Sequence, residues 1–249
     1  MMMKEALLRD LRLHIAAVEH GGNHRSVLPF GIPTIDRALP EGGLPQGALH
    51  ECAGGDLGAV HGAAAALFVA GVLARLNGQV LWCLRARDLF APALAGAGLN
   101  PDRVIYAEAS DDKMILLSME EGLRHRGLAG VVGEVARLPM TASRRLQLAA
   151  ENSGVTAFVI RRWRIATEAA QFNQPSAAAT RWRITAAPSA PLPVPGIGRP
   201  RWKLELLRCR GGDSAEWDVE VCDETGYLAL SAELADGSAA AEERHRISA

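Results

Sequence analysis

The sequence predicts an α/β fold in which a parallel sheet is flanked by helices and antiparallel strands are added at the C-terminal side. Short apolar runs alternate with helical patterns through residues 48–161, which is typical of successive βαβ units. Residues 79–84 and 128–134 are apolar on both faces, as strands of a covered parallel sheet are. Residues 180–186 and 202–210 instead alternate apolar and polar side chains, which favours antiparallel strands with one wet face.

Each element of this fold has its own local signal. Strands are expected at 48–53, 79–84, 104–107, 128–134 and 155–161, followed by 180–186, 202–210, 216–221 and 227–230. Helices are expected at 63–76, 89–96, 111–126 and 141–153. Asp111 or Ser110 and Thr141 are candidate N-caps, and Gly154 is a stop signal. Residues 31–47 and the proline-rich 187–200 are expected to be loops.

The chain divides into three expected parts. Residues 1–22 form an amphipathic helix in this interpretation, residues 28–232 a core domain, and residues 233–249 a disordered acidic tail. The apolar stripe of the first helix consists of Leu7, Leu8, Leu11 and Ile15. This stripe could pack on its own domain or serve as a partner helix on a neighbouring subunit.

Charge is distributed unevenly along the chain, although the formal net charge is only −1. Residues 161–210 contain ten basic side chains and two acidic ones, whereas residues 211–249 contain ten acidic side chains and two arginines. Nine of the basic residues are candidates for binding DNA or a partner: Arg161, Arg162, Arg164, Arg181, Arg183, Arg201, Lys203, Arg208 and Arg210. Tryptophans interleave with them, which suits phosphate pairing and base stacking. The alternative is that the tryptophans face the core and the arginines form a solvated strand face.

The remaining bulk features point to a protein of the cytoplasm. The four cysteines have no metal-ligand spacing, so reduced thiols and no metal site are expected. No apolar run reaches the roughly 18 residues that a membrane span requires, so no membrane contact is expected.

Residues 31–47 carry the most specific motif of the sequence. The pattern G-x-x-x-[LI]-D-x-x-L is met by Gly31, Ile35, Asp36 and Leu39. The string GGLPxG follows at Gly42-Gly43-Leu44-Pro45-Gln46-Gly47 and leads into the strand expected at 48–53. The order and spacing of both resemble the segment that precedes the phosphate loop in the RecA family. The resemblance implies a RecA-like core.

The loop that should bind nucleotide lacks the side chains that a Walker A motif supplies. GxxxxGK[ST] needs a lysine for the phosphates and a hydroxyl for Mg²⁺. The matching loop contains Gly54, Gly58 and Gly62, followed by Ala63 and Ala64 at the lysine and threonine positions. No lysine occurs between Lys4 and Lys113. No bound cofactor is therefore expected.

Two further ATPase positions also depart from the RecA pattern. The carboxylate that activates water corresponds to Ala86, with Asp88 as a substitute about two residues out of register. The Walker B acid corresponds to Gly133. Glu134 follows it, and because side chains alternate along a strand, Glu134 is expected to face away from the site. We therefore expect no ATP hydrolysis and no catalytic residues.

A RecA-like chain of this length without the Walker lysine resembles the ImuA family. The resemblance implies an accessory role in SOS-induced translesion DNA synthesis. Its implied partners are an ImuB-like homologue of the Y-family polymerases and the associated error-prone polymerase, with RecA and DNA as further candidates. The resemblance also places Arg208 and Arg210 near basic residues that RecA uses across its subunit interface.

Two alternative functions stay open. Some members of the family carry the label of SulA-like cell division inhibitors, which implies inhibition of septum formation. A DNA-dependent nucleotide-binding protein with an atypical site is the other alternative. The missing lysine favours the adaptor over a nucleotide-dependent protein.

Overall fold

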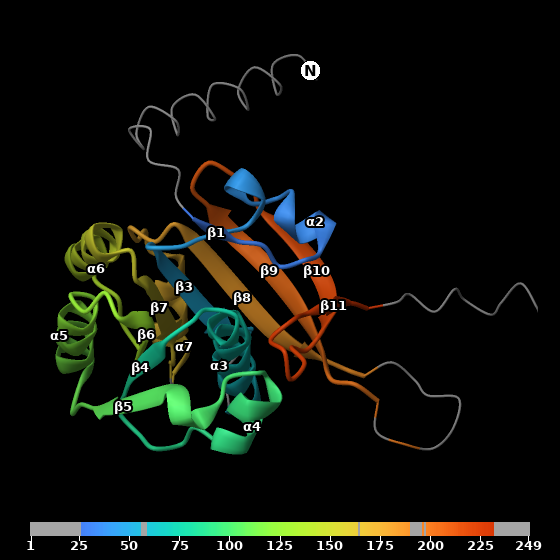
Figure 1. Cartoon of the computed structure of the whole chain (residues 1–249), viewed down its shortest axis with the longest axis horizontal. Coiled ribbons are helices and arrows are strands. Elements are labelled where there is room, and N and C mark those ends of the chain that lie inside the picture. Colours follow the sequence, from blue (N-terminus) through green and yellow to red (C-terminus); the bar gives the residue numbers. More distant parts are fainter. Residues whose placement is uncertain (1–25, 56–58, 164, 190–195, 197, 232–249) are drawn as a thin grey trace, which may run out of the picture.

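The fold is built on one nine-stranded sheet (Figure 1). The computed structural model describes residues 26–55, 59–163, 165–189, 196 and 198–231. The strand order is β11-β10-β9-β8-β3-β7-β6-β4-β5. The parallel strands are β3 (Leu49–Gly54), β4 (Gln79–Leu84), β5 (Val104–Glu108), β6 (Leu128–Val135), β7 (Thr156–Arg161) and β8 (Thr180–Ala187). The antiparallel strands are β9 (Arg201–Cys209), β10 (Ala215–Glu220) and β11 (Ala229–Leu230). The predicted fold class is confirmed, with one refinement: β8 pairs parallel to β3 and only its other edge is antiparallel.

Helices cover both faces of the parallel strands (Figure 1). On one face lie α3 (Ala59–Ala74) and α4 (Ala91–Gly96), and on the other α5 (Asp112–Gly122) and α6 (Met140–Ser153). The alternation along β6 explains the two layers, because Val132 packs with the α3 side and Val131 with the α5–α6 side. Each side has its own cluster of fully buried apolar residues, as two-sided burial of a parallel sheet requires.

The motif at residues 31–47 folds into short elements rather than an open loop. Strand β1 (Val27–Leu28) pairs with β2 (Leu44–Pro45), and between them lie α2 (Pro33–Asp36) and the 3-10 turn η1 (Pro40–Gly42). The Asp36 carboxylate accepts hydrogen bonds from the backbone N–H groups of Phe30 and Gly31, at 2.6 and 3.0 Å. Asp36 therefore closes this segment on itself, which is the structural role of the aspartate in the motif.

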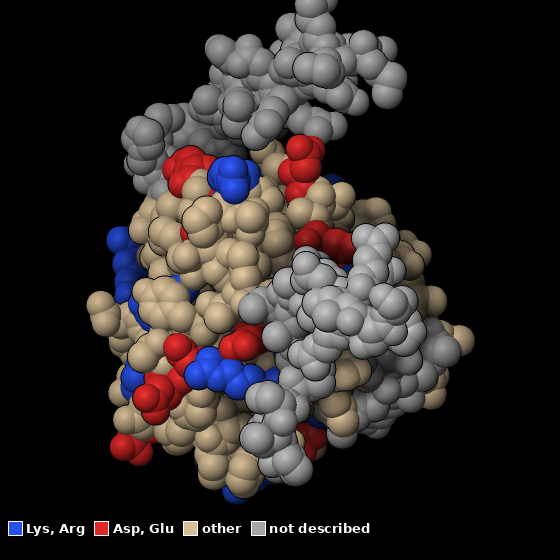
Figure 2. Space-filling view, turned by 90° about the vertical axis from the view of Figure 1, so that its right-hand side faces the viewer, with Lys and Arg blue, Asp and Glu red and all other residues tan. Residues whose placement is uncertain are grey.

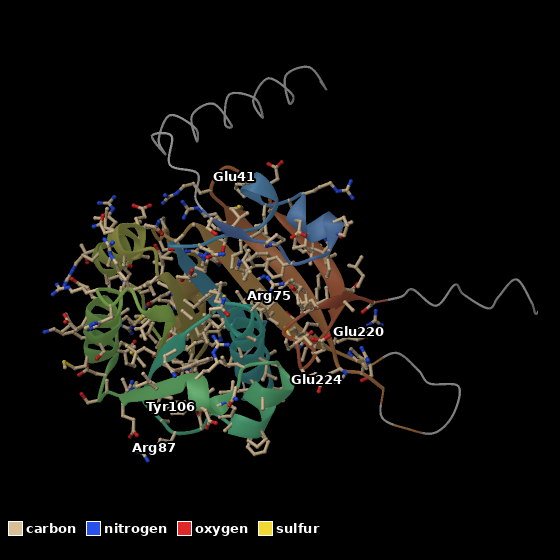
Figure 3. All side chains as sticks on the ribbon, in the orientation of Figure 1. Glu41, Arg75, Arg87, Tyr106, Glu220 and Glu224 are labelled. Atoms are coloured by element: carbon tan, nitrogen blue, oxygen red, sulfur yellow. The ribbon has the colours of Figure 1, made fainter. Side chains whose placement is uncertain are left out.

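Arg75 ties this N-terminal segment to the end of α3. Its Nη2 donates to the Pro29 carbonyl at 2.6 Å, and its guanidinium lies 4.7 Å from the centre of the Tyr227 ring. Figure 3 shows Arg75 in the middle of the molecule, between the N-terminal elements and the C-terminal strands. Burial of this side chain lowers the pKa of its guanidinium. The contacts thus join three regions that are far apart in sequence.

Several predicted boundaries need correction. Helix α3 begins at Ala59, four residues before the expected start, and the short elements η2 (Pro101–Arg103), α7 (Ala166–Ala170) and η3 (Gln171–Asn173) were not expected. The Asp111 cap is confirmed, because its carboxylate accepts from the Met114 N–H at 2.9 Å. The Thr141 cap is wrong: α6 has Pro139 at its N-cap and no side-chain cap. Gly154 ends α6 in the left-handed conformation, as expected.

Some predictions fall outside the described residues. These are the partner helix with Leu7, Leu8, Leu11 and Ile15, the loop residue Gly58, Arg164, and the acidic tail at 233–249. The four cysteines are free thiols. Within the described ranges, no group of three or more potential ligands gathers to hold a metal ion, and no helix is long and apolar enough to cross a membrane.

His50 lies fully buried in β3 and joins three segments through its ring nitrogens. Nε2 donates to the Pro45 carbonyl at 2.8 Å, since a carbonyl can only accept. Nδ1 must then accept from the Thr180 hydroxyl at 2.8 Å, and that hydroxyl oxygen accepts from Trp182 Nε1 at 2.7 Å. Desolvation by burial lowers the pKa of His50 from 6.5 to about 4, so the imidazole is neutral, and the hydrogen-bond chain then fixes its tautomer.

We expect His50 to make folding sensitive to acid. Because its folded pKa lies below its unfolded pKa, its contribution is fully present above pH 6.5 and falls as the pH drops toward 4. At about 1.4 kcal/mol per pKa unit, the loss between pH 7.5 and 4.5 is about 2 to 3 kcal/mol. Urea unfolding at several pH values should show this loss in the wild type and a flatter profile in His50→Gln. His125→Gln, at an exposed position, is the control and should keep the wild-type profile.

Candidate functional site

The loop between β3 and α3 lies at the carboxyl ends of the parallel strands, where open α/β sheets place their ligands. Gly55 packs against β8 so closely that a Cβ there would lie 1.9 Å from Thr185 Oγ1, so close backbone packing demands this glycine. In the first turns of α3, Gly62 is followed by the exposed Ala63 and the buried Ala64. Methyl groups at these two positions offer neither a charge nor a hydroxyl to a phosphate.

A cluster of charged side chains occupies the space beside this first turn. We call it the Arg162 cluster; it consists of Arg162, Asp88, Glu134 and Trp82. Arg162 follows β7 and binds Asp88 with two parallel hydrogen bonds, Nη1–Oδ1 at 2.8 Å and Nη2–Oδ2 at 2.6 Å. Its Nη1 also binds Glu134 Oε2 at 2.6 Å, and Trp82 Nε1 donates to Glu134 Oε1 at 2.8 Å. The cluster therefore ties together the carboxyl ends of β4, β6 and β7.

The cluster borders the helix that would hold phosphates in an ATPase. A Cβ placed on Gly62 would lie 3.9 Å from Arg162 Nε, so the guanidinium lies against the first turn of α3. Hydrogen bonding to Arg162 lowers the pKa of Asp88, and the same contact raises the pKa of Arg162. Both groups are therefore charged at neutral pH. Two carboxylates against one guanidinium give the cluster a formal charge of −1.

The charges of the Arg162 cluster determine which ligands this site can bind. A phosphate needs a net positive environment, from a lysine, a metal ion or free helix N–H groups. Here the guanidinium is already satisfied by two carboxylates, and Glu134 is only 4% exposed. In this arrangement Arg162 is engaged by carboxylates and is not free to bind a phosphate.

The expectation for Glu134 is wrong. Gly133 and Glu134 do lie on opposite faces of β6, but Glu134 is the one that faces α3 and the Arg162 cluster. Gly133 faces α5, where a Cβ would come 2.2 Å from Met119 Sδ. Any larger residue at 133 would therefore collide with α5, and the acid nearest to a Walker B position is Glu134. Ala86 is exposed, and Asp88, the suggested substitute acid, belongs to the Arg162 cluster.

Two of the nine candidate DNA-binding residues are buried. Arg161 and Arg181 both bind Glu51, a carboxylate in β3 with no exposed surface, at 2.7 and 2.9 Å. The Ser176 hydroxyl donates to the same carboxylate at 2.7 Å. We call these four residues the Glu51 cluster. Arg161 and Arg181 are only 3% and 9% exposed, so the structure places them in the interior instead of at a DNA surface.

The tryptophans that interleave with the arginines face the core. Trp182 is fully buried and Trp202 is 3% exposed, and both belong to the apolar layer on the α3 side. Trp163 is partly buried and packs against Phe172, with ring centres 5.5 Å apart. Bases cannot stack on rings placed in this way. The alternative of core-facing tryptophans is the one that the structure favours.

Basic residues of the antiparallel strands face acidic partners across the sheet. On one face of β8, β9 and β10, Arg183 lies opposite Glu205, Lys203 opposite Asp218, and Arg201 opposite Glu220. Lys203 also forms an ion pair with Glu216, with its Nζ 3.0 Å from Oε2. Figure 2 shows the side of the molecule that lies on the right in Figure 1, and the acidic and basic side chains visible there are mixed among uncharged ones. The acidic residues after 211 therefore offset the basic segment before it.

Arg208 and Arg210 lie at the opposite end of the sheet from the Arg162 cluster. Arg208 Nη1 donates to the Ser176 carbonyl at 2.6 Å, and Arg210 Nη2 donates to the Ala177 carbonyl at 3.0 Å. The described basic candidates are thus divided among the interior, the strand face and both ends of the sheet. They form no single patch in the part of the chain that the structure describes.

The Arg162 cluster could have been found from the sequence by a simple rule. The carboxyl ends of parallel strands converge at one edge of a sheet, and Asp88, Glu134 and Arg162 each follow or end a predicted strand. Oppositely charged groups brought to one edge should pair. By contrast, nothing in the local sequence around Glu51 indicates that it receives arginines 110 and 130 residues away.

Comparisons with known proteins agree on the fold and on one set of relatives. No family model matches the chain. The chain is 41% identical over 232 residues to Protein ImuA of Caulobacter vibrioides, in strains NA1000 / CB15N and ATCC 19089 / CIP 103742 / CB 15; the match covers 88% of this chain and 95% of the relative. The crystal structure of the RadB recombinase superimposes with a TM-score of 0.56 and 17% identity over 82% of this chain and 99% of that chain. The likeness to RadB concerns the fold alone and confirms a RecA-like core.

Proposed function

This chain belongs to the ImuA family, and on that premise we propose that it is a non-catalytic, RecA-like accessory protein of translesion DNA synthesis. In this role it is an adaptor for an ImuB-type, polymerase-like partner and the associated error-prone polymerase. The family resemblance supports expression under SOS control in the cytoplasm. RecA is a further candidate partner.

The Arg162 cluster is the observation that carries the non-catalytic part of this proposal. Phosphoryl transfer depends on positive groups that offset the charge on the transferred phosphate, each contributing several kcal/mol. At this site Ala63 stands in place of the lysine, and Arg162 already binds Asp88 and Glu134. For Arg162 to bind the phosphates of Mg-ATP, its ion pairs with Asp88 and Glu134 would have to break.

A calorimetric titration tests the non-catalytic role directly. We expect no heat of binding from Mg-ATP at millimolar concentration, and no ATP hydrolysis above the background of a buffer control. Adding the missing groups in Ala63→Lys with Ala64→Thr should not create an ATPase, because the Arg162 cluster still lies against the helix. Micromolar binding to the wild type would contradict the proposal.

The adaptor role is tested by co-purification. The full chain should bind the ImuB-type protein encoded by its own genome in the absence of nucleotide, and ATP should not change the amount recovered. If no such protein is retained, the adaptor role fails whatever the titration shows.

DNA is a weaker candidate than a protein partner. Non-specific DNA binding depends on unpaired basic side chains that release counterions. Within the described residues, Arg183 and Lys203 have acidic partners across the sheet, and Arg161 and Arg181 are buried. These four side chains therefore give little support to DNA binding.

A further inference from the structure

Three large apolar side chains are exposed around the Arg162 cluster. Phe90 is 69% exposed, Val60 66% and Ile165 55%. Phe90 precedes α4, Val60 lies in the first turn of α3, and Ile165 precedes α7. Among the other large apolar side chains of the described residues, Leu148 on α6 is 57% exposed and Ile105 on β5 is 50% exposed. We call Val60, Phe90 and Ile165 the apolar ring.

The apolar ring is tied to the cluster by short chain distances. Phe90 is two residues from Asp88, Val60 two residues from Gly62, and Ile165 three residues from Arg162. A chain of three residues spans at most about 11 Å, so Phe90 and Ile165 lie within that distance of the cluster, and Val60 lies within it of Gly62, against which Arg162 packs. Each comes from a different strand-to-helix connection, and these connections meet at the carboxyl edge of the sheet.

The apolar ring together with the Arg162 cluster differs from a nucleotide pocket and resembles a protein interface. Exposed apolar groups gathered in one place mark a binding surface more than scattered ones do. Beside the apolar ring lies an ion pair in which the two Nη atoms of Arg162 already bind the Asp88 carboxylate, so a partner that covers the pair does not leave either charge unpaired. We propose that the apolar ring and the Arg162 cluster form a docking surface for a partner protein that presents an apolar side chain beside a lysine or arginine.

The charge of the cluster selects the basic partner. Asp88 is the more exposed of its two carboxylates, at 49%, and the cluster carries a formal charge of −1. The amino end of α3 contributes only about half a positive charge, which does not cancel it. The nearby Arg85 and Arg87 are engaged with Asp112 and Glu108. Among the described residues, a lysine or arginine therefore complements the exposed Asp88 carboxylate better than an acidic group does.

Panning a random-peptide phage library on the immobilised full chain tests the inference. The inference rests on the proposed absence of nucleotide from this site. The panning experiment needs no purified partner. We expect enrichment of peptides that carry a bulky apolar residue flanked by lysine or arginine. A synthetic copy of an enriched peptide should bind Phe90→Asp at least about tenfold more weakly than the wild type, as loss of a central apolar anchor does. Replacing its basic residue with glutamate should weaken binding to a similar degree.

A matched control variant and a set of contrary outcomes complete the test of the inference. Leu148→Asp changes another exposed apolar residue, 57% exposed on α6, and the peptide should bind this variant like the wild type. Thermal melts of both variants verify that they fold. Failure to enrich any peptide, acidic peptides, equal binding to Phe90→Asp, or self-association of the chain that Phe90→Asp abolishes would overturn the inference alone. Displacement of the peptide by Mg-ATP would overturn the proposed function as well.

Discussion

Replacing Glu51 with alanine is expected to destabilise the folded protein by about 3 to 5 kcal/mol. Glu51 is fully buried and accepts hydrogen bonds from Arg161, Arg181 and Ser176. Its removal leaves two buried guanidinium groups without a counter-charge. The rings and carbonyls that remain around them, such as Phe172 at 5.2 Å from Arg181, cannot neutralise that charge. Urea unfolding at pH 7 measures the change as a shift of the midpoint.

The control is Glu216→Ala, which removes an exposed partner of Lys203. The Lys203 side chain is 46% exposed and that of Glu216 64%, so the loss should stay below about 1 kcal/mol. A triple change, Glu51→Leu with Arg161→Met and Arg181→Met, removes every charge at once and should recover much of the stability lost in Glu51→Ala. Equal stability of Glu51→Ala and Glu216→Ala would show that the buried charges are not coupled as the distances indicate.

The order and class of the main elements could be predicted from the sequence because hydrophobic periodicity reports burial directly. The apolar runs at β4 and β6 are buried on both sides, and the strand β9 places Trp202, Leu204 and Leu206 on its core face. The motif around Asp36 could also be recognised, because its aspartate closes a local segment. Such signals depend on residues close together in the chain.

Pairings between distant residues could not be predicted in the same way. Arg161 and Arg181 were candidates for a DNA surface, since an arginine in a sequence gives no sign of a buried acid elsewhere that will bind it. The acidic residues of β10 neutralise β9 because strand pairing sets them opposite each other, and the local sequence does not reveal that register. Charge counted along the chain thus differs from charge on the folded surface.

The expectation for Glu134 failed for a different reason. Alternation along a strand correctly separated Gly133 from Glu134, but which face carries the site depends on where α3 packs. The Walker B motif was aligned on Gly133, and the packing of Met119 shows why a glycine is needed there. Alternation along a strand shows that two neighbouring side chains point to opposite faces of the sheet. Only the position of the neighbouring helix shows which of these faces carries the site.

Replacing Arg162 with methionine is expected to cost about 3 kcal/mol at pH 7, toward the lower end of values for buried ion pairs because its side chain is one-third exposed. The change leaves Glu134, which is 4% exposed, beside Asp88 with only the Trp82 N–H as a partner. Like charges without a bridging cation repel, and the carboxyl ends of β4 and β6 lose their link.

The stability lost in Arg162→Met should depend on pH, in a direction that follows from the pKa of Asp88. The hydrogen bond from Arg162 lowers the pKa of Asp88 below its usual 3.8, so the stability it contributes is present above that value and is lost as the pH falls through the folded pKa. Methionine at 162 removes this contribution, and acid also neutralises the two stranded carboxyl groups. The difference between wild type and variant should therefore be largest near neutral pH and should narrow below about pH 4.

Urea unfolding of the wild type and Arg162→Met between pH 3.5 and 7.5 measures this dependence. Arg87→Met is the matched control, because Arg87 is 83% exposed and pairs with Glu108 of the edge strand β5; Figure 3 labels Arg87 at the periphery of the molecule. Its loss should change stability little at any pH. A pH-independent difference for Arg162→Met would mean that its effect comes from packing, and the electrostatic account of the cluster would then be wrong. If instead the difference narrows in acid, the guanidinium holds two carboxylates together at the place where a RecA-type ATPase holds its phosphates.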